Sequence, residues 1–398
     1  MDGINGQALP SGICFQHIKA LSNVSKLSIW FSCGSREEKD GEYGIVHLAE
    51  HCIYYIIKEK MINTSASVSA QISYDYTLLE ITVLNEEIDK VIKILSECFL
   101  NPIISTEVIQ MEKKRIGEEY IARSVNKDYM MTDLLYESIW NNQLNHSPMG
   151  KLELINGFEL IRVQSIIRKI LCSRMVIVYM GGIEYYQMIS ILSSAKLQEF
   201  TQEESNIVAE FKDVNQDIIM GKEKKVEHLN LVFVPSEKIK GSDYAKFVFW
   251  STALAGHPRA ILPEKICFQN PLSYYVKSET INHRLESMLK ISAIINNDKL
   301  TEVEKHIKEA VYNVKLIDEK QFKQIKVIMD SYMQEMLNSS SSLMRFIGNI
   351  LIINSNLESN EALDVIVNCA QRISLDDIYD FHNRNIVNYK VSTVNFKG

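Results

Sequence analysis

The sequence predicts an α+β fold of two similar halves, and three observations support this prediction. The chain has 398 residues, which exceeds the size of one ordinary domain, so two domains are expected. Strand-like and helix-like patterns occur in both halves. Both halves also end with a helical pattern followed by an apolar strand, at 158–180 and at 374–396. The repeated ending indicates an internal duplication, in which each half is an α+β layer of about 180 residues.

In the first half, a strand and a polar loop precede the first apolar helix. Residues 26–32 read Lys-Leu-Ser-Ile-Trp-Phe-Ser, which approaches the alternation of a strand. The polar run at 34–44 predicts a loop that leads into the helix. Further strands are expected at 65–73, 76–83 and 173–180. Helices are expected at 85–100, 105–123, 129–142 and 158–171, with a turn at 145–150.

The second half follows a polar and charged stretch around 202–225. We therefore expect a first domain at 1–205, a linker at 206–225 and a second domain at 226–398. Strands are predicted at 228–234, 272–277 and 390–396. Helices are predicted at 244–254, 301–314, 319–337, 341–354 and 374–385.

The composition is that of a globular protein and excludes several partner classes. Hydrophobic residues make up 46% of the chain and charged residues 23%. The net charge is -7, and no basic stripe carries interleaved aromatic residues, so no nucleic-acid partner is expected. The 7 Cys are scattered without a Cys-x-x-Cys pair, which indicates buried free thiols in a reducing compartment. No targeting pattern or membrane-spanning apolar run is present, so we expect a cytoplasmic protein without membrane contact.

The most informative motif is at 47–51, where His47 and His51 stand three before and one after Glu50. Positions i, i+3 and i+4 share one face of a helix, so the two imidazoles and the carboxylate can converge. Imidazole is a good zinc ligand, and Glu50 is placed to take a proton from a zinc-bound water. The order His-x-x-Glu-His is typical of the inverted zinc-peptidase motif. The alternative is a polar surface face, but the motif is flanked by apolar residues, and polar groups on a buried helix need partners.

A third zinc ligand is expected from another element. Catalytic zinc takes three protein ligands and a water, whereas structural zinc takes four protein ligands. The predicted helix at 105–123 carries Glu112 and Glu119, which lie seven positions apart and share a face. Glu118 points about a third of a turn away. One carboxylate could bind zinc while another orients a His, and an ordinary charged helix face is the alternative that spacing leaves open.

Four further segments and the zinc helix together make up a family pattern. They are a Leu-Pro-Ser-Gly segment at 9–12, a Gly-Ser-Arg-Glu-Glu loop at 34–38, the zinc helix at 44–51, an edge strand at 69–77 and a His-Ser-Pro-Met-Gly turn at 146–150. Together these segments resemble the pitrilysin/insulinase family of inverted-motif zinc peptidases. The similarity is to the short two-domain branch of mitochondrial processing peptidase subunits and bacterial heterodimeric relatives, with 9–12 as the opening strand of that family.

The resemblance implies a fold and a set of site residues. The fold is two homologous domains, each a mostly antiparallel sheet with helices packed on one face, which form a clam-like chamber on dimerisation. His47, His51 and Glu119 would bind Zn²⁺, Glu112 would be the carboxylate that orients a His, and Glu50 would be the catalytic base. Substrate would add to the edge strand by β-augmentation, at Ser69, Ala70, Gln71, Ile72 and Ser73.

The chain departs from the family at one catalytic position. Active members also use an Arg and a Tyr, seven apart, in the second half of a chain. Tyr274 fits the Tyr, whereas Cys267 stands where the Arg is expected. A neutral thiol cannot replace a guanidinium as an anion donor. Because some members divide the zinc motif and the Arg/Tyr pair between two chains, we expect a heterodimer in which this chain bears the zinc, with a homodimer as the other possibility.

The expected function is hydrolysis of short or unstructured peptides by a zinc metalloendopeptidase, including leader-peptide or precursor processing. Two alternatives remain open. A non-catalytic subunit of a two-chain peptidase is favoured by Cys267 and opposed by the intact zinc motif. A binding protein with a structural metal would need a fourth protein ligand, and the sequence offers none nearby.

Overall fold

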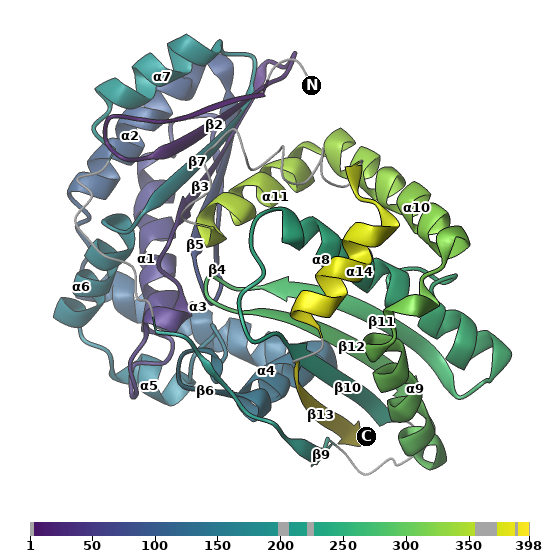
Figure 1. Cartoon of the computed structure of the whole chain (residues 1–398). Coiled ribbons are helices and arrows are strands. Elements are labelled where there is room, and N and C mark those ends of the chain that lie inside the picture. The colour runs from purple at the N-terminus through teal and green to yellow at the C-terminus, as the bar shows by residue number, and fades with distance from the viewer. Residues whose placement is uncertain (1–3, 198–206, 221–226, 355–371, 387–388, 398) are drawn as a thin grey trace. The chain divides into compact units, whose positions relative to one another are not determined.

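The computed structural model describes residues 4–197, 207–220, 227–354, 372–386 and 389–397 (Figure 1). The described residues form two compact units. The N-terminal unit contains the described residues within 1–136, 143–207 and 339–362, and the C-terminal unit those within 137–142, 208–338 and 363–398. Each unit is an α+β layer, as predicted. The expected linker at 206–225 is in part sheet, because it contains β8 (Glu210–Phe211) and β9 (Asn215–Ile219).

The N-terminal unit contains a six-stranded, mostly antiparallel sheet of order β1-β2-β7-β3-β5-β4. Strands β2 and β7 pair in parallel, and the other described neighbours pair antiparallel. The strands are β1 (Ile4–Ala8), β2 (Cys14–Lys19), β3 (Val24–Phe31), β4 (Ser67–Ile72), β5 (Thr77–Leu84) and β7 (Met175–Gly181). The expectation of a strand at 9–12 was wrong. These residues form the turn between β1 and β2, closed by a bond from the Gly12 amide to the Leu9 carbonyl at 2.9 Å.

Helices cover one face of this sheet, which β3 lines with Leu27, Ile29 and Phe31. The helices of that core are α1 (Ile45–Lys60), α2 (Ile88–Leu100), α3 (Thr106–Ser124), α6 (Leu160–Leu171) and α7 (Tyr185–Ser194). The unit also contains α5 (Leu152–Gly157) and most of α4 (Lys127–Ile139). The helical segments expected at 85–100, 105–123 and 158–171 correspond to α2, α3 and α6.

A helix from far downstream covers the other face of the same sheet (Figure 1). This helix is α11 (Ser340–Ile353), which packs on β7 and β3. Trp30 of β3 points to this face and is buried beneath Gly348, where an added Cβ would overlap the indole. Arg345 donates from Nε to Glu80 Oε1 of β5 at 2.9 Å. Helix α11 therefore packs with the N-terminal unit, although the expected boundaries assigned 341–354 to the second domain.

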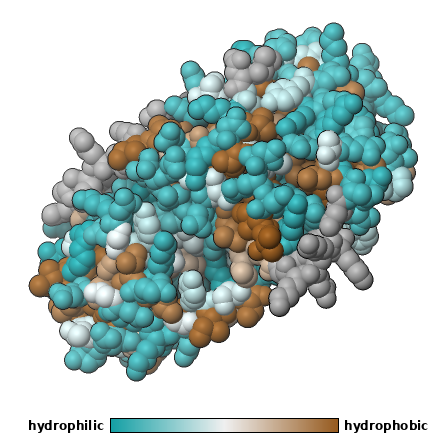
Figure 2. Space-filling model, turned by 90° about the horizontal axis from the view of Figure 1, so that it is seen from below, coloured by the Kyte–Doolittle hydropathy of each residue, from teal (hydrophilic) through white to brown (hydrophobic). Residues whose placement is uncertain are grey.

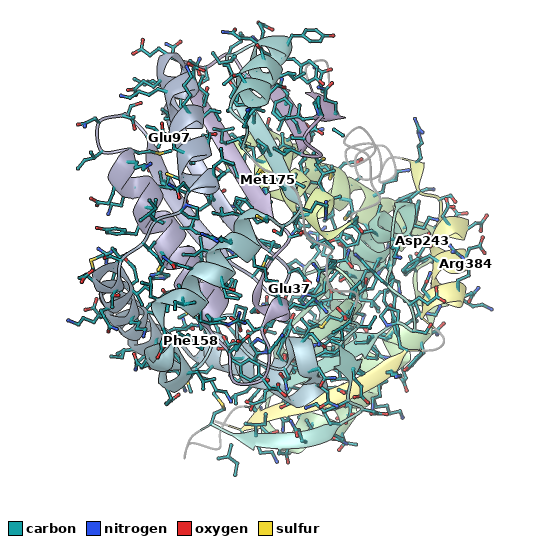
Figure 3. All side chains as sticks on the ribbon, turned by 90° about the vertical axis from the view of Figure 1, so that its left-hand side faces the viewer. Glu37, Glu97, Phe158, Met175, Asp243 and Arg384 are labelled. Carbon is teal, nitrogen blue, oxygen red and sulfur yellow. The ribbon has the colours of Figure 1, made fainter. Side chains whose placement is uncertain are left out.

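The C-terminal unit contains a five-stranded sheet of order β11-β12-β10-β13-β9. Besides β9, its strands are β10 (Glu227–Val234), β11 (Ser273–Asn282), β12 (Ser287–Ile295) and β13 (Lys390–Lys397). Its longer helices are α8 (Ser242–Ala255), α9 (Leu300–Tyr312), α10 (Glu319–Asn338) and α14 (Leu375–Asn385). An ion pair joins α8 to α14, with Arg384 Nη1 3.0 Å from Asp243 Oδ2 (Figure 3).

The two sheets share one topology. The order β2-β7-β3-β5-β4 in the N-terminal unit corresponds to β9-β13-β10-β12-β11 in the C-terminal unit. The first pair is parallel in both sheets, and the other pairs are antiparallel. Each sheet also receives its closing strand directly after a helix, as α6 precedes β7 and α14 precedes β13. The predicted repeated ending is therefore present, and the repeat extends to all five strands of the C-terminal sheet and to every strand of the N-terminal sheet except β1.

None of the described helices is both long and apolar enough to cross a bilayer. On the face seen in Figure 2, apolar residues gather in separate clusters between hydrophilic ones. Six of the cysteines lie in the described part of the chain, where none of them forms a disulfide, and Cys369 lies outside it.

Candidate metal centre

The His-x-x-Glu-His motif lies in the first two turns of α1. The helix begins after Gly44, whose φ is +100°. His47 and Glu50 are buried, and the His51 side chain is 18% exposed. The neighbouring residues of the helix belong to the core of the unit. The motif is therefore on a buried helix, where its polar side chains need partners.

The two imidazoles converge on one carboxylate of α3. The Nε2 atoms of His47 and His51 lie 3.6 and 3.4 Å from Glu119 Oε2. One ligand atom each from His47, Glu50 and His51 also lie within 4.8 Å of one another. The Glu119 side chain is 49% exposed, so the site opens to solvent on that side. Two imidazoles and a carboxylate form a donor set that suits zinc with an open position, and these residues fit the ion.

Outer contacts fix the orientation of both rings. Glu112 is fully buried, and its Oε2 lies 3.1 Å from His51 Nδ1. The other oxygen of Glu112 accepts from Arg115 Nη1 at 2.6 Å. His47 Nδ1 lies 3.4 Å from the carbonyl oxygen of Met149. Because each Nδ1 is engaged, each Nε2 is left to face Glu119, which is the usual arrangement of metal-binding His.

The carboxylates around the site shift its protonation equilibria. Burial raises the pKa of Glu50, and the neighbouring His side chains oppose this rise. Burial lowers the pKa of His51, but hydrogen bonds to Glu112 and Glu119 outweigh it and raise the pKa to about 9. The same bonds from His47 and His51 hold the pKa of Glu119 well below its usual range. The cluster therefore favours a positive charge at its centre, which is the electrostatic requirement of a cation site.

The comparison with protein families covers this whole cluster. Residues 17–151 match the model described as Insulinase (Peptidase family M16). The chain carries an insulinase-family domain. The matched segment contains both His, the intervening Glu50 and the two aligned carboxylates of α3.

Curated relatives of the insulinase-family domain match over part of their length. Mitochondrial-processing peptidase subunit beta of Dictyostelium discoideum is 23% identical over 192 residues, which are 46% of this chain and 41% of the relative. An uncharacterized zinc protease of Rickettsia felis is 29% identical over 126 residues, which are 30% of each chain. The chain thus spans less than half the length of these relatives in either match.

Solved structures share the fold over the whole chain. A protease from Helicobacter pylori has a TM-score of 0.82 at 16% identity and covers 99% of both chains. A peptidase M16 inactive domain from Pseudomonas fluorescens also has a TM-score of 0.82, at 14% identity, and covers 99% of this chain and 98% of that one. At these identities the likeness shows the insulinase-type fold alone.

The structure distinguishes the three carboxylates of α3 by position. Glu119 faces both imidazoles and Glu112 lies behind His51. Glu118 is exposed, and in the described part of the chain its carboxylate makes no bond to either ring. The shared face of Glu112 and Glu119 was predicted from their spacing. The geometry favours Glu119 over Glu118 as a ligand, and the role of each stays a prediction.

The expected substrate strand is β4, at the edge of the insulinase-family sheet. Within the described residues β4 pairs with β5 alone, and α1 packs beside it. Residues 69–72 lie in the strand and leave part of their backbone unpaired, as β-augmentation requires. Ser73 is a correction, because it lies after the strand ends. Its amide donates to the Tyr76 carbonyl at 2.9 Å and its carbonyl accepts from the Ser35 amide at 3.1 Å.

Tyr274 and Cys267 lie in the C-terminal unit. Tyr274 sits at the bulge near the start of β11 and is 89% exposed. Cys267 lies on a π-helical segment, Pro263–Gln269, and lines with Tyr274 a cavity of about 990 Å³. Burial raises the pKa of Cys267, so its thiol is neutral at pH 7. The catalytic role of Tyr274 stays a prediction.

Two glycines, Gly44 and Gly150, bring their backbones into close contact beside the site. Gly44 has φ +100° and Gly150 has φ +75°, both in the left-handed region. A Cβ added at Gly150 would overlap the Gly44 Cα. This contact brings the Met149 carbonyl to His47. Sequence reasoning missed it, because it joins two loops that are far apart in the chain.

Replacing Gly150 with Ala is expected to destabilise the protein. The φ angle and the clash with Gly44 together should lower the free energy of unfolding by at least about 2 kcal/mol. Urea titration followed by circular dichroism measures this change. Gly157→Ala is the matched control, because no atom lies within 4 Å of its added Cβ. Equal stability of the two variants would contradict the contact.

Proposed function

We propose that the chain is a zinc metalloendopeptidase that hydrolyses short or unstructured peptides. The observation that carries this proposal is the convergence of His47, His51 and Glu119, with Glu50 beside them on a buried helix. Helix α1, which carries the two His and Glu50, packs beside β4, the strand at the edge of the described sheet. A cation site, a carboxylate base and a strand edge for an extended peptide are the parts that peptide hydrolysis needs.

His47, His51 and Glu119 would hold the zinc ion. When bound, zinc lowers the pKa of water and polarises a carbonyl. Glu50 accepts a proton from the attacking water at its carboxylate and returns it to the leaving amine. Its burial and raised pKa suit this role, since a base that must also act as an acid works best with a pKa near the operating pH. Glu112 and the Met149 carbonyl keep the two rings in place.

We further propose that the active form is a heterodimer. Cys267 stands where the family resemblance predicts an Arg, and the neutral thiol supplies no positive charge to a developing oxyanion. A related partner chain would supply the Arg/Tyr pair. The reaction of the resulting heterodimer would be leader-peptide or precursor processing. The cytoplasmic location stays a prediction.

The second candidate is a non-catalytic subunit of a two-chain peptidase. Cys267 favours it, and one structural neighbour is itself described as an inactive domain. The donor set of the N-terminal unit opposes it, because a subunit without chemistry has no need for two His, one of them buried, and a buried Glu on one helix face.

One experiment separates the two candidates. The purified chain is loaded with zinc, its metal content is measured, and it is incubated with a mixture of unstructured peptides whose products are read by mass spectrometry. Cleavage by the chain alone supports the peptidase and removes the need for a partner. A full zinc complement with cleavage only after addition of an Arg-bearing relative supports the heterodimer. Failure to bind zinc overturns the peptidase proposal.

A further inference from the structure

The loop between β3 and α1 touches both functional elements of the N-terminal unit. Its first part contacts the turn that follows β4, and its last part contacts the start of α1. The loop is buried over most of its length, although it is polar. Buried polar groups destabilise a fold unless each has a hydrogen-bond partner, so the partners of these loop residues indicate what the loop holds in place.

The first part of the loop is bonded to the turn after β4. Arg36 donates from Nε to Asp75 Oδ1 at 2.6 Å, and both side chains are buried. The Arg36 amide donates to the Tyr74 carbonyl at 2.8 Å. The Ser35 amide donates to the Ser73 carbonyl at 3.1 Å. These bonds hold the end of the edge strand against the loop.

The last part of the loop is bonded to the start of α1. The Glu38 carboxylate accepts from the Gly44 amide at 3.0 Å and from the Val46 amide at 2.9 Å. These are amides that a helix leaves unpaired at its N-terminus. Glu38 Oε2 also lies 3.0 Å from His146 Nε2. His146 belongs to the turn whose Met149 carbonyl contacts His47.

We propose that Arg36 and Glu38 are positioning residues that fix the position of the peptide-binding strand β4 relative to the metal-binding helix α1. Arg36 sets the strand, through Asp75. Glu38 sets the helix directly and sets the His47 ring through the turn at 146–149. The inference rests on the proposed function, because it assigns β4 to the peptide and α1 to the metal.

Substitutions in the first and last parts of the loop are expected to change two different affinities. Glu38→Gln leaves one acceptor oxygen where two now serve the α1 amides and His146, so its NH2 group must face one of these partners, and we expect it to weaken zinc binding about tenfold. The double variant Arg36→Met/Asp75→Leu replaces a buried ion pair by apolar side chains, which commonly preserves folding. We expect it to weaken peptide binding about tenfold, because the strand is no longer preorganised. Each variant should leave the other affinity within about twofold.

The test measures two binding constants. Zinc affinity is measured by chelator competition, and the affinity for a labelled unstructured peptide is measured by fluorescence anisotropy in a Glu50→Gln background. Glu37→Gln is the matched control, because Glu37, labelled in Figure 3, lies in the same loop but pairs with Lys169, whose Nζ is 3.2 Å from Glu37 Oε2. Thermal melting verifies that each variant is folded. If Glu38→Gln does not fold, His146→Gln replaces it.

Each outcome decides the inference. Separate losses, zinc for Glu38 and peptide for Arg36/Asp75, support it. Equal losses of both affinities in folded variants, no loss in either, or no peptide binding by the parent chain overturn it. Absence of hydrolysis by the wild-type chain counts against the proposed function and not against this inference, since neither binding constant depends on turnover.

Discussion

Replacing Glu50 with Gln is expected to abolish peptide hydrolysis while zinc stays bound. The Gln side chain keeps the shape of Glu50 but cannot accept the proton of the attacking water. Loss of a positioned base should lower kcat by about 10²- to 10⁴-fold. Zinc affinity should change little, because Glu119 lies closer to the His51 Nε2 atom than Glu50 does, at 3.4 Å against 4.0 Å.

The measurement pairs peptide turnover with metal content on the same preparation, in the presence of whichever partner the wild-type chain needs. Glu59→Gln is the matched control, because Glu59 lies on the same helix and is exposed. Wild-type turnover in Glu50→Gln would show that another group acts as the base. Loss of zinc from that variant would instead make Glu50 a ligand.

Replacing Glu119 with Ala is expected to cause the largest loss of zinc affinity among the acidic residues of α3. Its carboxylate is the one that faces both Nε2 atoms, at 3.6 and 3.4 Å. Replacing a residue that orients a metal ligand lowers metal affinity about 10- to 100-fold. Replacing a ligand itself should therefore lower the affinity by more than about 100-fold. Chelator competition measures this difference.

Glu118→Ala provides the control for this experiment within the same helix turn. Glu118 is exposed and carries the same charge, so it reports the effect of net charge alone. We expect a change of less than about twofold, as for an exposed carboxylate outside the site. A larger loss in Glu118→Ala than in Glu119→Ala would reverse the assignment of the ligand.

Local patterns predicted the parts of the site that one helix contains. The three-and-four spacing placed His47, Glu50 and His51 on one face, and the seven-residue spacing placed Glu112 with Glu119. Spacing could not choose between Glu118 and Glu119, because that choice depends on how α3 packs beside α1. A crossing of two helices is a tertiary property that neither helix pattern records.

The sequence was less informative where the chain returns to a distant segment. The Met149 carbonyl and the Gly44–Gly150 contact are backbone features, so no side-chain pattern announces them. The expectation of a strand at 9–12 was wrong because it rested on the family resemblance. The Pro-Ser-Gly run at this position favours a turn, and the chain forms that turn. The packing of α11 on the N-terminal sheet could not be predicted either, because the apolar pattern of a helix does not indicate which sheet it packs on.

The position of α11 has a consequence for biosynthesis. The N-terminal sheet can bury Trp30 and the rest of that face only after the ribosome has made residues up to Ile353. Until then one face of β3 and β7 is uncovered, although every strand of that sheet has emerged. Such late, non-local closure slows folding and prolongs exposure to aggregation. A fragment that ends before Ser340 would therefore contain the zinc motif and every strand of its sheet but would lack the helix that covers one face of that sheet.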